Sequence, residues 1–294
     1  VVVGQDRFLE RVMVALLAQG HLLVEGVPGL AKTLTVKTLS QAIRGSFKRI
    51  QFTPDLVPAD LVGTRIYNQK TGDFGTSLGP VFANLLLADE INRAPSTVRT
   101  PSREVMQEGQ GPIARTSHKL PTTFTVRATL SALPKPLSAS LPEAQVDRFM
   151  MKVLVDYPSD EEEFVIVQRV IGVPAVMSPI ASTYELAELQ AACRSVYVDP
   201  ALIQYAVQLV GATRRPEQYG LKDHARFISF GASPRASISL VEGARALAMM
   251  RGRRYALIED MTDLVHDVLR HRLVLSYEPL AEGMSAGKLI DQIM

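Results

Sequence analysis

Hydrophobic and polar positions follow two different patterns along the chain. Up to about residue 175, short apolar runs that resemble buried strands alternate with stretches of helical spacing. Beyond that point the strand pattern nearly disappears, and apolar residues recur every three or four positions. The sequence therefore predicts an α/β domain over residues 1–175, with a parallel sheet flanked by helices, and an all-α domain over residues 176–294.

The same pattern predicts individual elements. Helices are expected at 6–19, 34–43, 96–108, 142–149, 160–171, 183–196, 200–212, 234–251 and 259–271. Strands are expected at 21–25, 47–52, 82–90, 123–129 and 151–155. Residues 58–80 follow a different pattern, which predicts a short helix and then a hairpin. They are interpreted as an insertion. Ser159 and Glu162 form a predicted capping box.

A glycine-bearing loop joins the first predicted strand to the second predicted helix. It fits the phosphate-binding pattern GxxxxGK[ST], with Ala31 where glycine is usual. Backbone N–H groups of such a loop, and of the helix that follows, surround phosphates, while Lys32 adds charge and the Thr33 hydroxyl can ligate Mg²⁺. The predicted nucleotide-binding residues here are Gly26, Val27, Pro28, Gly29, Leu30, Ala31, Lys32, Thr33 and Leu34.

Two adjacent carboxylates end the apolar run at residues 82–90. Neighbours in a strand point to opposite faces, but a turn at the end of the strand can bring both toward a nucleotide. In that arrangement Asp89 would hold Mg²⁺ through water, and Glu90 would polarise the attacking water. The alternative is a solvated acidic pair that opens a turn, and the phosphate loop upstream makes this the minor interpretation.

Composition narrows the function classes. The chain has 294 residues, a formal net charge of +2 and 6% aromatic residues, so neither a nucleic-acid surface nor a membrane surface is expected. No apolar run reaches the length of a membrane span. The single cysteine, Cys193, is expected to be a small buried hydrophobic side chain, and a reducing, cytoplasmic location is expected. The chain does not begin with Met, and a preceding segment is expected.

Seven segments together resemble the MoxR family of AAA+ ATPases, and the likeness covers nearly the whole chain. The Asp-Glu-Ile-Asn-Arg-Ala-Pro and Pro-Glu-Ala-Gln segments are the most specific. The segments that carry the resemblance are Val3–Gln5, Gly26–Thr33, Arg49–Leu56, Gly79–Asn84, Leu86–Pro95, Leu141–Phe149 and Gly231–Arg235.

The resemblance implies an AAA+ core with an insertion in its second helix, a helical lid, and a ring, usually hexameric, with ATP at the subunit interfaces. It also implies a chaperone that assembles or activates protein complexes, with partners that carry von Willebrand factor A domains. Carried onto this chain, it places Val3, Gly4 and Gln5 beside the adenine. Arg148 becomes the arginine finger and Arg235 the sensor arginine of the lid.

The sequence departs from the family pattern between residues 96 and 140. Ser131 stands where the family carries the sensor asparagine, and Pro101 interrupts a predicted helix. ATP binding is therefore expected, and two functions stay open. The leading one is an ATP-hydrolysing motor that acts on protein partners. The alternative is an ATP-gated assembly scaffold with little or no hydrolysis. A nucleic-acid motor and a small-molecule kinase are disfavoured.

Overall fold

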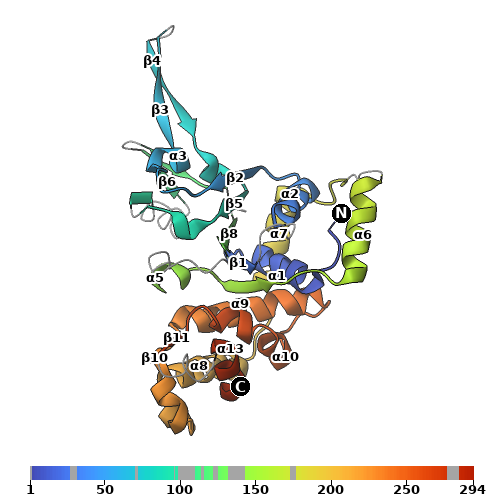
Figure 1. Ribbon diagram of the computed structural model, residues 1–294, viewed down its shortest axis with the longest axis vertical. Coiled ribbons are helices and arrows are strands. Elements are labelled where there is room, and N and C mark those ends of the chain that lie inside the picture. The colour runs from blue at the N-terminus through green and yellow to red at the C-terminus, as the bar shows by residue number, and fades with distance from the viewer. Residues whose placement is uncertain are drawn as a thin grey trace. The chain divides into compact units, whose positions relative to one another are not determined.

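The fold is that of a computed structural model (Figure 1). The structure describes residues 2–26, 32–69, 72–95, 97–98, 110–113, 116–121, 125–131, 143–172, 177–276 and 285–294. Contacts divide the chain into two compact units, which are described separately below. The first comprises Val1–Glu10, Leu23–Leu141 and Leu154–Glu188, and the second comprises Arg11–Leu22, Pro142–Val153 and Leu189–Met294. The domain boundary at residues 175/176 stays a prediction.

A five-stranded sheet in the order β2-β5-β8-β1-β9 forms the α/β part of the chain. β2 and β8 both run parallel to β5, which lies between them. All residues of β5 are buried, as expected for a strand covered on both faces. The strands are β1 (Leu22–Gly26), β2 (Phe47–Gln51), β5 (Leu85–Asp89), β8 (Thr125–Ser131) and β9 (Met151–Val155). The predicted α/β class and the predicted strands are confirmed.

The first strand lies in the interior of this sheet, between β8 and β9. The chain leaves β1 through α2 (Lys32–Ala42), which packs against β2 and β5, and then enters the edge strand β2. Strand order therefore reverses beside β1. In open α/β sheets such a reversal, at the carboxyl ends of the strands, is where ligands bind.

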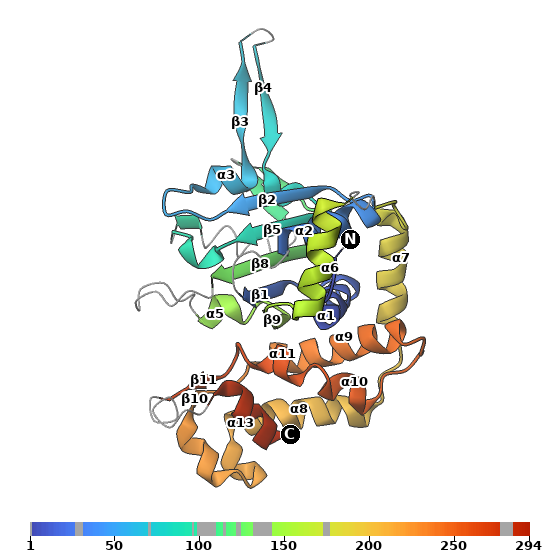
Figure 2. The ribbon, with the colours of Figure 1, turned by 45° about the vertical axis from the view of Figure 1, so that its right-hand side comes forward.

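The predicted insertion forms a short helix and a hairpin, α3 (Pro58–Val62), β3 (Gly63–Asn68) and β4 (Asp73–Leu78). The hairpin extends away from the sheet (Figure 2). Gly63 is required at its base, because φ is +93° and an added Cβ would lie 2.0 Å from the carbonyl oxygen of Ser77. A second hairpin, β6 (Gln110–Ile113) and β7 (Thr116–Lys119), also belongs to this unit.

Helix α6 (Asp160–Ile171) begins with the predicted capping box. Ser159 accepts a hydrogen bond from the backbone N–H of Glu162, and the Glu162 side chain accepts one from the backbone N–H of Ser159. Helix α7 (Thr183–Arg194) follows. None of the α6 residues is buried, although the helix carries several apolar residues.

The second unit is mainly helical. Its long helices α8 (Pro200–Arg214) and α9 (Pro234–Met250) pack against each other, and both carry buried leucine and alanine residues. Its other elements are α5 (Glu143–Val146), η4 (Pro216–Tyr219), η5 (Lys222–Phe227), β10 (Ile228–Phe230), α10 (Ile258–Thr262), α11 (Val265–Leu269), β11 (Val274–Leu275) and α13 (Ala286–Ile293). α1 (Asp6–Leu17) spans the boundary between the two units.

One helix prediction in this unit was wrong. Residues 259–271 form two short helices, α10 and α11, and not one. Arg11 explains the break, because its guanidinium donates to the carbonyl oxygen and the carboxylate of Asp263 and to the carboxylate of Asp267. The pattern also missed β10 and α13. Most of the predicted helix 96–108, with Pro101, lies outside the described residues.

Two smaller predictions concern burial and membranes. Cys193 is buried and free, as predicted, and burial raises the pKa of its thiol to about 11. Among the described residues, no helix is long and apolar enough to span a membrane.

Candidate nucleotide-binding site

The phosphate loop begins where β1 ends, at Gly26. An added Cβ at this residue would lie 2.3 Å from the carbonyl oxygen of Val155, so glycine lets β1 pass close to β9 there. Val27, Pro28, Gly29, Leu30 and Ala31 lie outside the described residues, as does the side chain of Lys32. Thr33 and Leu34 lie in the first turn of α2, Thr33 half-buried and Leu34 exposed. Unpaired N–H groups at such a helix start suit a phosphate.

The N-terminal segment proposed to border the adenine lies beside the start of α6. Gly4 has a φ of +66°, and an added Cβ would lie 2.5 Å from the Glu162 carboxyl carbon. The amide of Gln5 donates to the carbonyl oxygen of Asp156 at 3.0 Å. Val3, Gly4 and Gln5 are half-buried. The segment is therefore held in place by contacts within the first unit.

The acidic pair ends β5 in an unusual backbone conformation. Asp89 is 8% exposed, and Glu90 follows it with φ 53° and ψ 46°, in the left-handed region. For a residue other than glycine this conformation costs about 1–3 kcal/mol, and three other described non-glycine residues of the chain also adopt a positive φ. Its effect is visible in the partners of the two carboxylates, since Asp89 pairs with Arg49 and Glu90 with Gln51.

Arg49 and Gln51 lie two residues apart on β2, so their side chains leave the same face of the sheet. The Nε of Arg49 lies 2.6 Å from Oδ2 of Asp89, and the Nε2 of Gln51 lies 2.9 Å from Oε2 of Glu90. Consecutive residues of a regular strand would point to opposite faces. The left-handed turn at Glu90 therefore brings both carboxylates to one face.

Two further residues complete this cluster. The hydroxyl of Thr129, on β8, donates to Oδ1 of Asp89 and accepts the backbone N–H of Glu90, both at 3.1 Å. The Nε of Arg93 lies 3.1 Å from Oε2 of Glu90. Thr129 thus links β8 to both acidic residues, two positions before Ser131, whose side chain lies outside the described residues.

Arg49, Gln51 and Thr129 have no role predicted from the sequence. A signal for the first two was present, because they alternate with buried Ile50 at the end of the strand that precedes the insertion. The missing information was the strand order. Only the pairing of β2 with β5 and of β5 with β8 places these side chains beside the acidic pair.

The oxygen donors at this site fit Mg²⁺. Carboxylate and hydroxyl oxygens are the ligands that Mg²⁺ prefers, and Asp89 and Thr33 supply one of each. Asp89 already attracts a cation, since the Arg49 guanidinium lies against its carboxylate. The assignment of Asp89 and Thr33 as Mg²⁺ ligands stays a prediction; a metal held there would neutralise charge on the phosphates of a bound nucleotide.

The second unit contains the predicted finger and sensor arginines, and both belong to the surroundings of Asp147. Arg235 lies in the first turn of α9 and pairs with Asp147 at 3.0 Å, while Arg148 directly follows Asp147 and is half-buried. Ser233 caps α9 and donates from its hydroxyl to both Asp147 carboxylate oxygens at 2.9 Å.

Arg272 fixes the segment that carries Arg148. It pairs with the Asp147 carboxylate at 2.9 Å and also donates to the carbonyl oxygens of Asp147, Phe149 and Met150. Burial alone would raise the pKa of Asp147, but hydrogen bonds from Arg235 and Ser233 and the charge of Arg272 hold that pKa below its ordinary value. Burial lowers the pKa of Arg272 to about 10 despite the opposing charge of Asp147.

Comparisons with known proteins define the class of this site. Residues 21–151 match the family model described as ATPase family associated with various cellular activities (AAA), and residues 220–293 match the AAA lid domain. A phosphate-loop ATPase core and a helical lid are therefore both present.

Individual relatives define the family. The chain is 48% identical to Chaperone MoxR1 of Mycobacterium tuberculosis, over all of this chain and 78% of that protein. It is 36% identical to the uncharacterized protein YeaC of Bacillus subtilis, over all of this chain and 90% of that protein. A crystal structure of a proposed ATPase from Cytophaga hutchinsonii matches with a TM-score of 0.94 and 44% identity, over all of this chain and 89% of that one. The chain belongs to the MoxR family of AAA+ ATPases.

This membership confirms the resemblance and the fold class derived from the sequence, an AAA+ core followed by a helical lid. It also places the chain among ATP-binding chaperone-like ATPases. The roles assigned to individual residues remain predictions and enter the proposal that follows.

Proposed function

We propose that the chain binds ATP with Mg²⁺, hydrolyses it, and uses the turnover to remodel or activate protein partners. The observation that carries the proposal is the left-handed turn at Glu90, which brings the two acidic side chains to one face of the sheet. A solvated acidic pair that only opened a turn would not need both carboxylates on one face of the sheet. The proposed geometry is that of a metal-holding carboxylate beside a general base.

The proposed roles follow from the chemistry of phosphoryl transfer, which depends on positioning and on neutralising charge. Lys32 and the backbone of residues 26–34 hold the phosphates. Glu90 takes a proton from the attacking water. Ser131, at the end of β8, replaces the expected sensor asparagine and can still offer a hydroxyl to that water.

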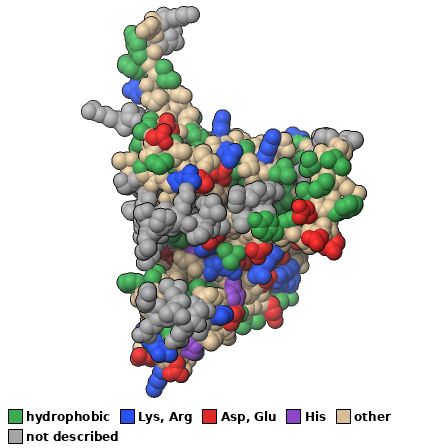
Figure 3. Space-filling view, in the orientation of Figure 1, with side chains coloured by type: hydrophobic (Ala, Val, Ile, Leu, Met, Phe, Trp, Pro, Cys, Tyr) green, Lys and Arg blue, Asp and Glu red, His purple; other side chains and the backbone are tan. Residues whose placement is uncertain are grey.

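Ring assembly is proposed on the exposed face of α6. Phe164, Val167, Val170 and Ile171 recur at helical spacing, and the last two are 77% and 79% exposed. Hydrophobic side chains gather where α6 lies (Figure 3). Contiguous exposed apolar surface of this kind marks an interaction site. We propose that this face of α6 contacts a neighbouring copy of the chain in a ring. In that ring, Arg148 of one subunit would act on the nucleotide of the next.

The resemblance supplies the partner class. One relative is named a chaperone, and proteins with von Willebrand factor A domains are the proposed clients or co-factors of this chain. We place the protein in the cytoplasm, as the sequence analysis expects.

One observation favours the alternative function, the ATP-gated scaffold. Asp89 is paired with Arg49, while Glu90 is bound by both Gln51 and Arg93. Each acidic side chain is thus engaged by an arginine, and a chain that kept the Arg49–Asp89 and Arg93–Glu90 ion pairs with nucleotide bound would not hydrolyse it.

The deciding experiment compares steady-state ATP hydrolysis and nucleotide binding in the unchanged protein and in Glu90→Gln. The motor function predicts that turnover falls about 100-fold or more, with nucleotide affinity kept, because a general base is removed. Glu188→Gln, an exposed glutamate of α7, is the matched control. Tight binding without turnover in the unchanged protein, at concentrations that form rings, would favour the scaffold.

Assembly is tested separately by analytical ultracentrifugation of Val170→Glu. The substitution places a charge on the exposed apolar face of α6 and is expected to shift the protein from rings to smaller species. Gln168→Glu adds the same charge at another exposed position of the helix and serves as the control. Intact rings in Val170→Glu would show that the exposed face of α6 does not form the subunit interface.

A further inference from the structure

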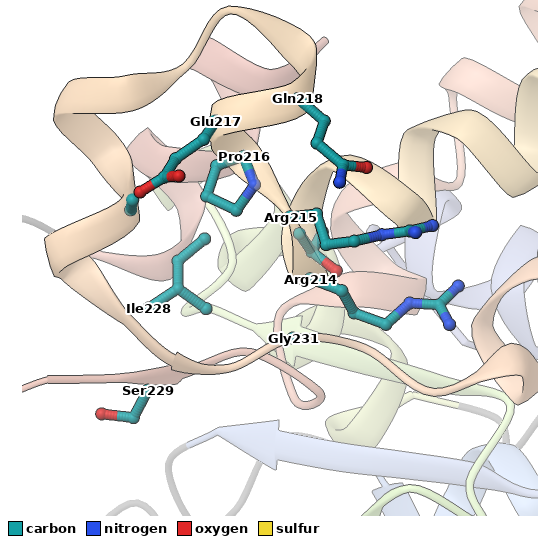
Figure 4. Close-up of a pocket in the computed structure, with 10 residues that line it drawn as sticks. Arg214, Arg215, Pro216, Glu217, Gln218, Ile228, Ser229 and Gly231 are labelled. Carbon is teal, nitrogen blue, oxygen red and sulfur yellow. The ribbon is translucent and has the colours of Figure 1, made fainter.

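A pocket in the second unit lies at the carboxyl end of α8, outside the cluster around Asp147. Its volume is about 290 Å³. The segment that ends α8 and enters η4, residues 213–218, forms one part of the lining. Residues 225, 228, 229 and 231 form the rest (Figure 4).

Two consecutive arginines supply the positive charge of this lining. Arg214 is the last residue of α8 and Arg215 follows it, and both side chains are exposed. Their guanidinium groups extend in the same direction (Figure 4). In the part of the chain that the structure describes, neither side chain forms a hydrogen bond or an ion pair.

The carboxyl end of a helix attracts cations, which explains why arginines occur here. It does not explain why both lack a carboxylate partner. Four other arginines of the same unit have one, since Arg251 and Arg253 both pair with Asp260, and Arg235 and Arg272 both pair with Asp147. Among the described residues, Arg226 and Arg254 also have none, but they are not adjacent to a second arginine that lines the same pocket. Two adjacent guanidiniums without an acid repel each other, and an external anion would relieve that repulsion.

The backbone beneath the arginines is held in place. The buried hydroxyl of Thr213 donates to the carbonyl oxygen of Val210 at 2.7 Å and accepts the backbone N–H of Ala232 at 2.9 Å. An added Cβ at Gly231 would lie 2.4 Å from the Thr213 carbonyl oxygen, so glycine permits the close approach. The Arg215 backbone is fixed by hydrogen bonds with Gly211 and Gln218. A ligand would therefore meet a preorganised pocket.

The pocket is not uniformly positive. Glu217 also lines it, and its side chain extends away from the two guanidiniums (Figure 4). A carboxylate opposes an anion with several charges but can accept hydrogen bonds from N–H groups. The lining thus suits a ligand with a single negative group on one side and N–H donors on the other. A peptide with an acidic side chain has both.

We propose that this pocket binds an acidic side chain on an extended segment of a partner protein. Arg214 and Arg215 hold the carboxylate through charge-assisted hydrogen bonds, and Glu217 accepts backbone N–H groups of the segment. The choice of a peptide rests on the proposed action on protein partners, but the pocket itself does not depend on ATP hydrolysis.

Fluorescence anisotropy with the whole chain tests the proposal without any ATPase measurement. The probe is a fluorescein-labelled peptide of alternating glutamate and glycine, and the same peptide with glutamine is its control. We expect saturable binding of the acidic peptide that weakens as salt is added. The double variant Arg214→Gln/Arg215→Gln should raise the Kd about tenfold or more, because two charge-assisted contacts are lost.

Arg254→Gln is the matched control, since Arg254 is another exposed arginine of this unit and lies outside the pocket lining. Its Kd should stay within twofold of the unchanged protein. Circular dichroism melting establishes that the variants fold. No binding of the acidic peptide, equal binding of the glutamine peptide, or an unchanged Kd in the double variant would each overturn the proposal. Inorganic phosphate that binds at the arginines while the peptide does not would also overturn it, in favour of a phosphate ligand.

Discussion

The side-chain amide of Gln51 donates a hydrogen bond of 2.9 Å to the carboxylate of Glu90. In the register of the sheet, Gln51 lies opposite Asp89, the residue before Glu90. The contact therefore links the end of β2 to the first residue after β5. Gln51, a residue of the neighbouring strand, therefore orients the carboxylate of Glu90. Glu90 is the proposed base, so this contact bears on the chemical step.

Removing this amide should impair the chemical step more than binding. In Gln51→Ala, turnover is expected to fall about tenfold, because the carboxylate of Glu90 loses a group that orients it. Nucleotide affinity should change less than twofold. Stopped-flow binding and steady-state hydrolysis measure the two quantities, with Gln208→Ala on exposed α8 surface as the control. Unchanged turnover would show that Gln51 does not position the base.

Arg49 should compete with Mg²⁺ for Asp89. Its guanidinium lies 2.6 Å from the carboxylate, although the arginine side chain is half-exposed. In Arg49→Gln, the Mg²⁺ concentration for half-maximal binding of a fluorescent ATP analogue is expected to fall several-fold, about threefold to tenfold, because the competing charge is gone. Arg49→Lys keeps a charge, so its Mg²⁺ concentration for half-maximal binding should lie between those of the unchanged protein and Arg49→Gln. A higher Mg²⁺ requirement in Arg49→Gln would instead make Arg49 part of the bound site.

Local signals predicted the elements that depend on local chemistry. The capping box of Ser159 and Glu162 marks the start of α6, and the alternation of Met151 to Val155 gives β9 with the predicted bounds. The phosphate loop and acidic pair were recognisable because their residue types and order are fixed by the chemistry of nucleotide binding.

Features that depend on distant residues were not predictable. Arg11 interrupts a helical pattern that lies about 250 positions further along the chain, through Asp263 and Asp267. The sequence did not indicate that Asp147 pairs with both Arg272 and Arg235, which lie about 90 or more positions further along the chain. No periodicity in the sequence shows which aspartate or glutamate a given arginine will pair with.

The Asp147 pair should be important for stability. Arg272 is almost fully buried, with a side chain 1% exposed, and Asp147 supplies its carboxylate. In Asp147→Asn the free energy of unfolding is expected to fall by about 3–5 kcal/mol, because a buried charge loses its partner. Urea unfolding measures this change. Glu242→Gln breaks a more exposed pair with Arg245 and should cost about 1 kcal/mol or less. Equal losses in the two variants would contradict this assignment.

Stability should also fall on mild acidification, because of His271. Burial and the charge of Arg272 hold the pKa of His271 well below its ordinary value. The lowered pKa keeps the folded ring neutral, and its Nε2 donates to the carbonyl oxygen of Phe149 at 3.0 Å. Below the ordinary pKa, about 6.5, the unfolded chain binds a proton that the folded chain does not. The free energy of unfolding should therefore decrease as pH falls, with a slope of up to about 1.4 kcal/mol per pH unit from this group. Urea unfolding between pH 7.5 and 5 measures the slope, which should become shallower in His271→Gln but not in His118→Gln. An unchanged slope in His271→Gln would show that another group binds the proton.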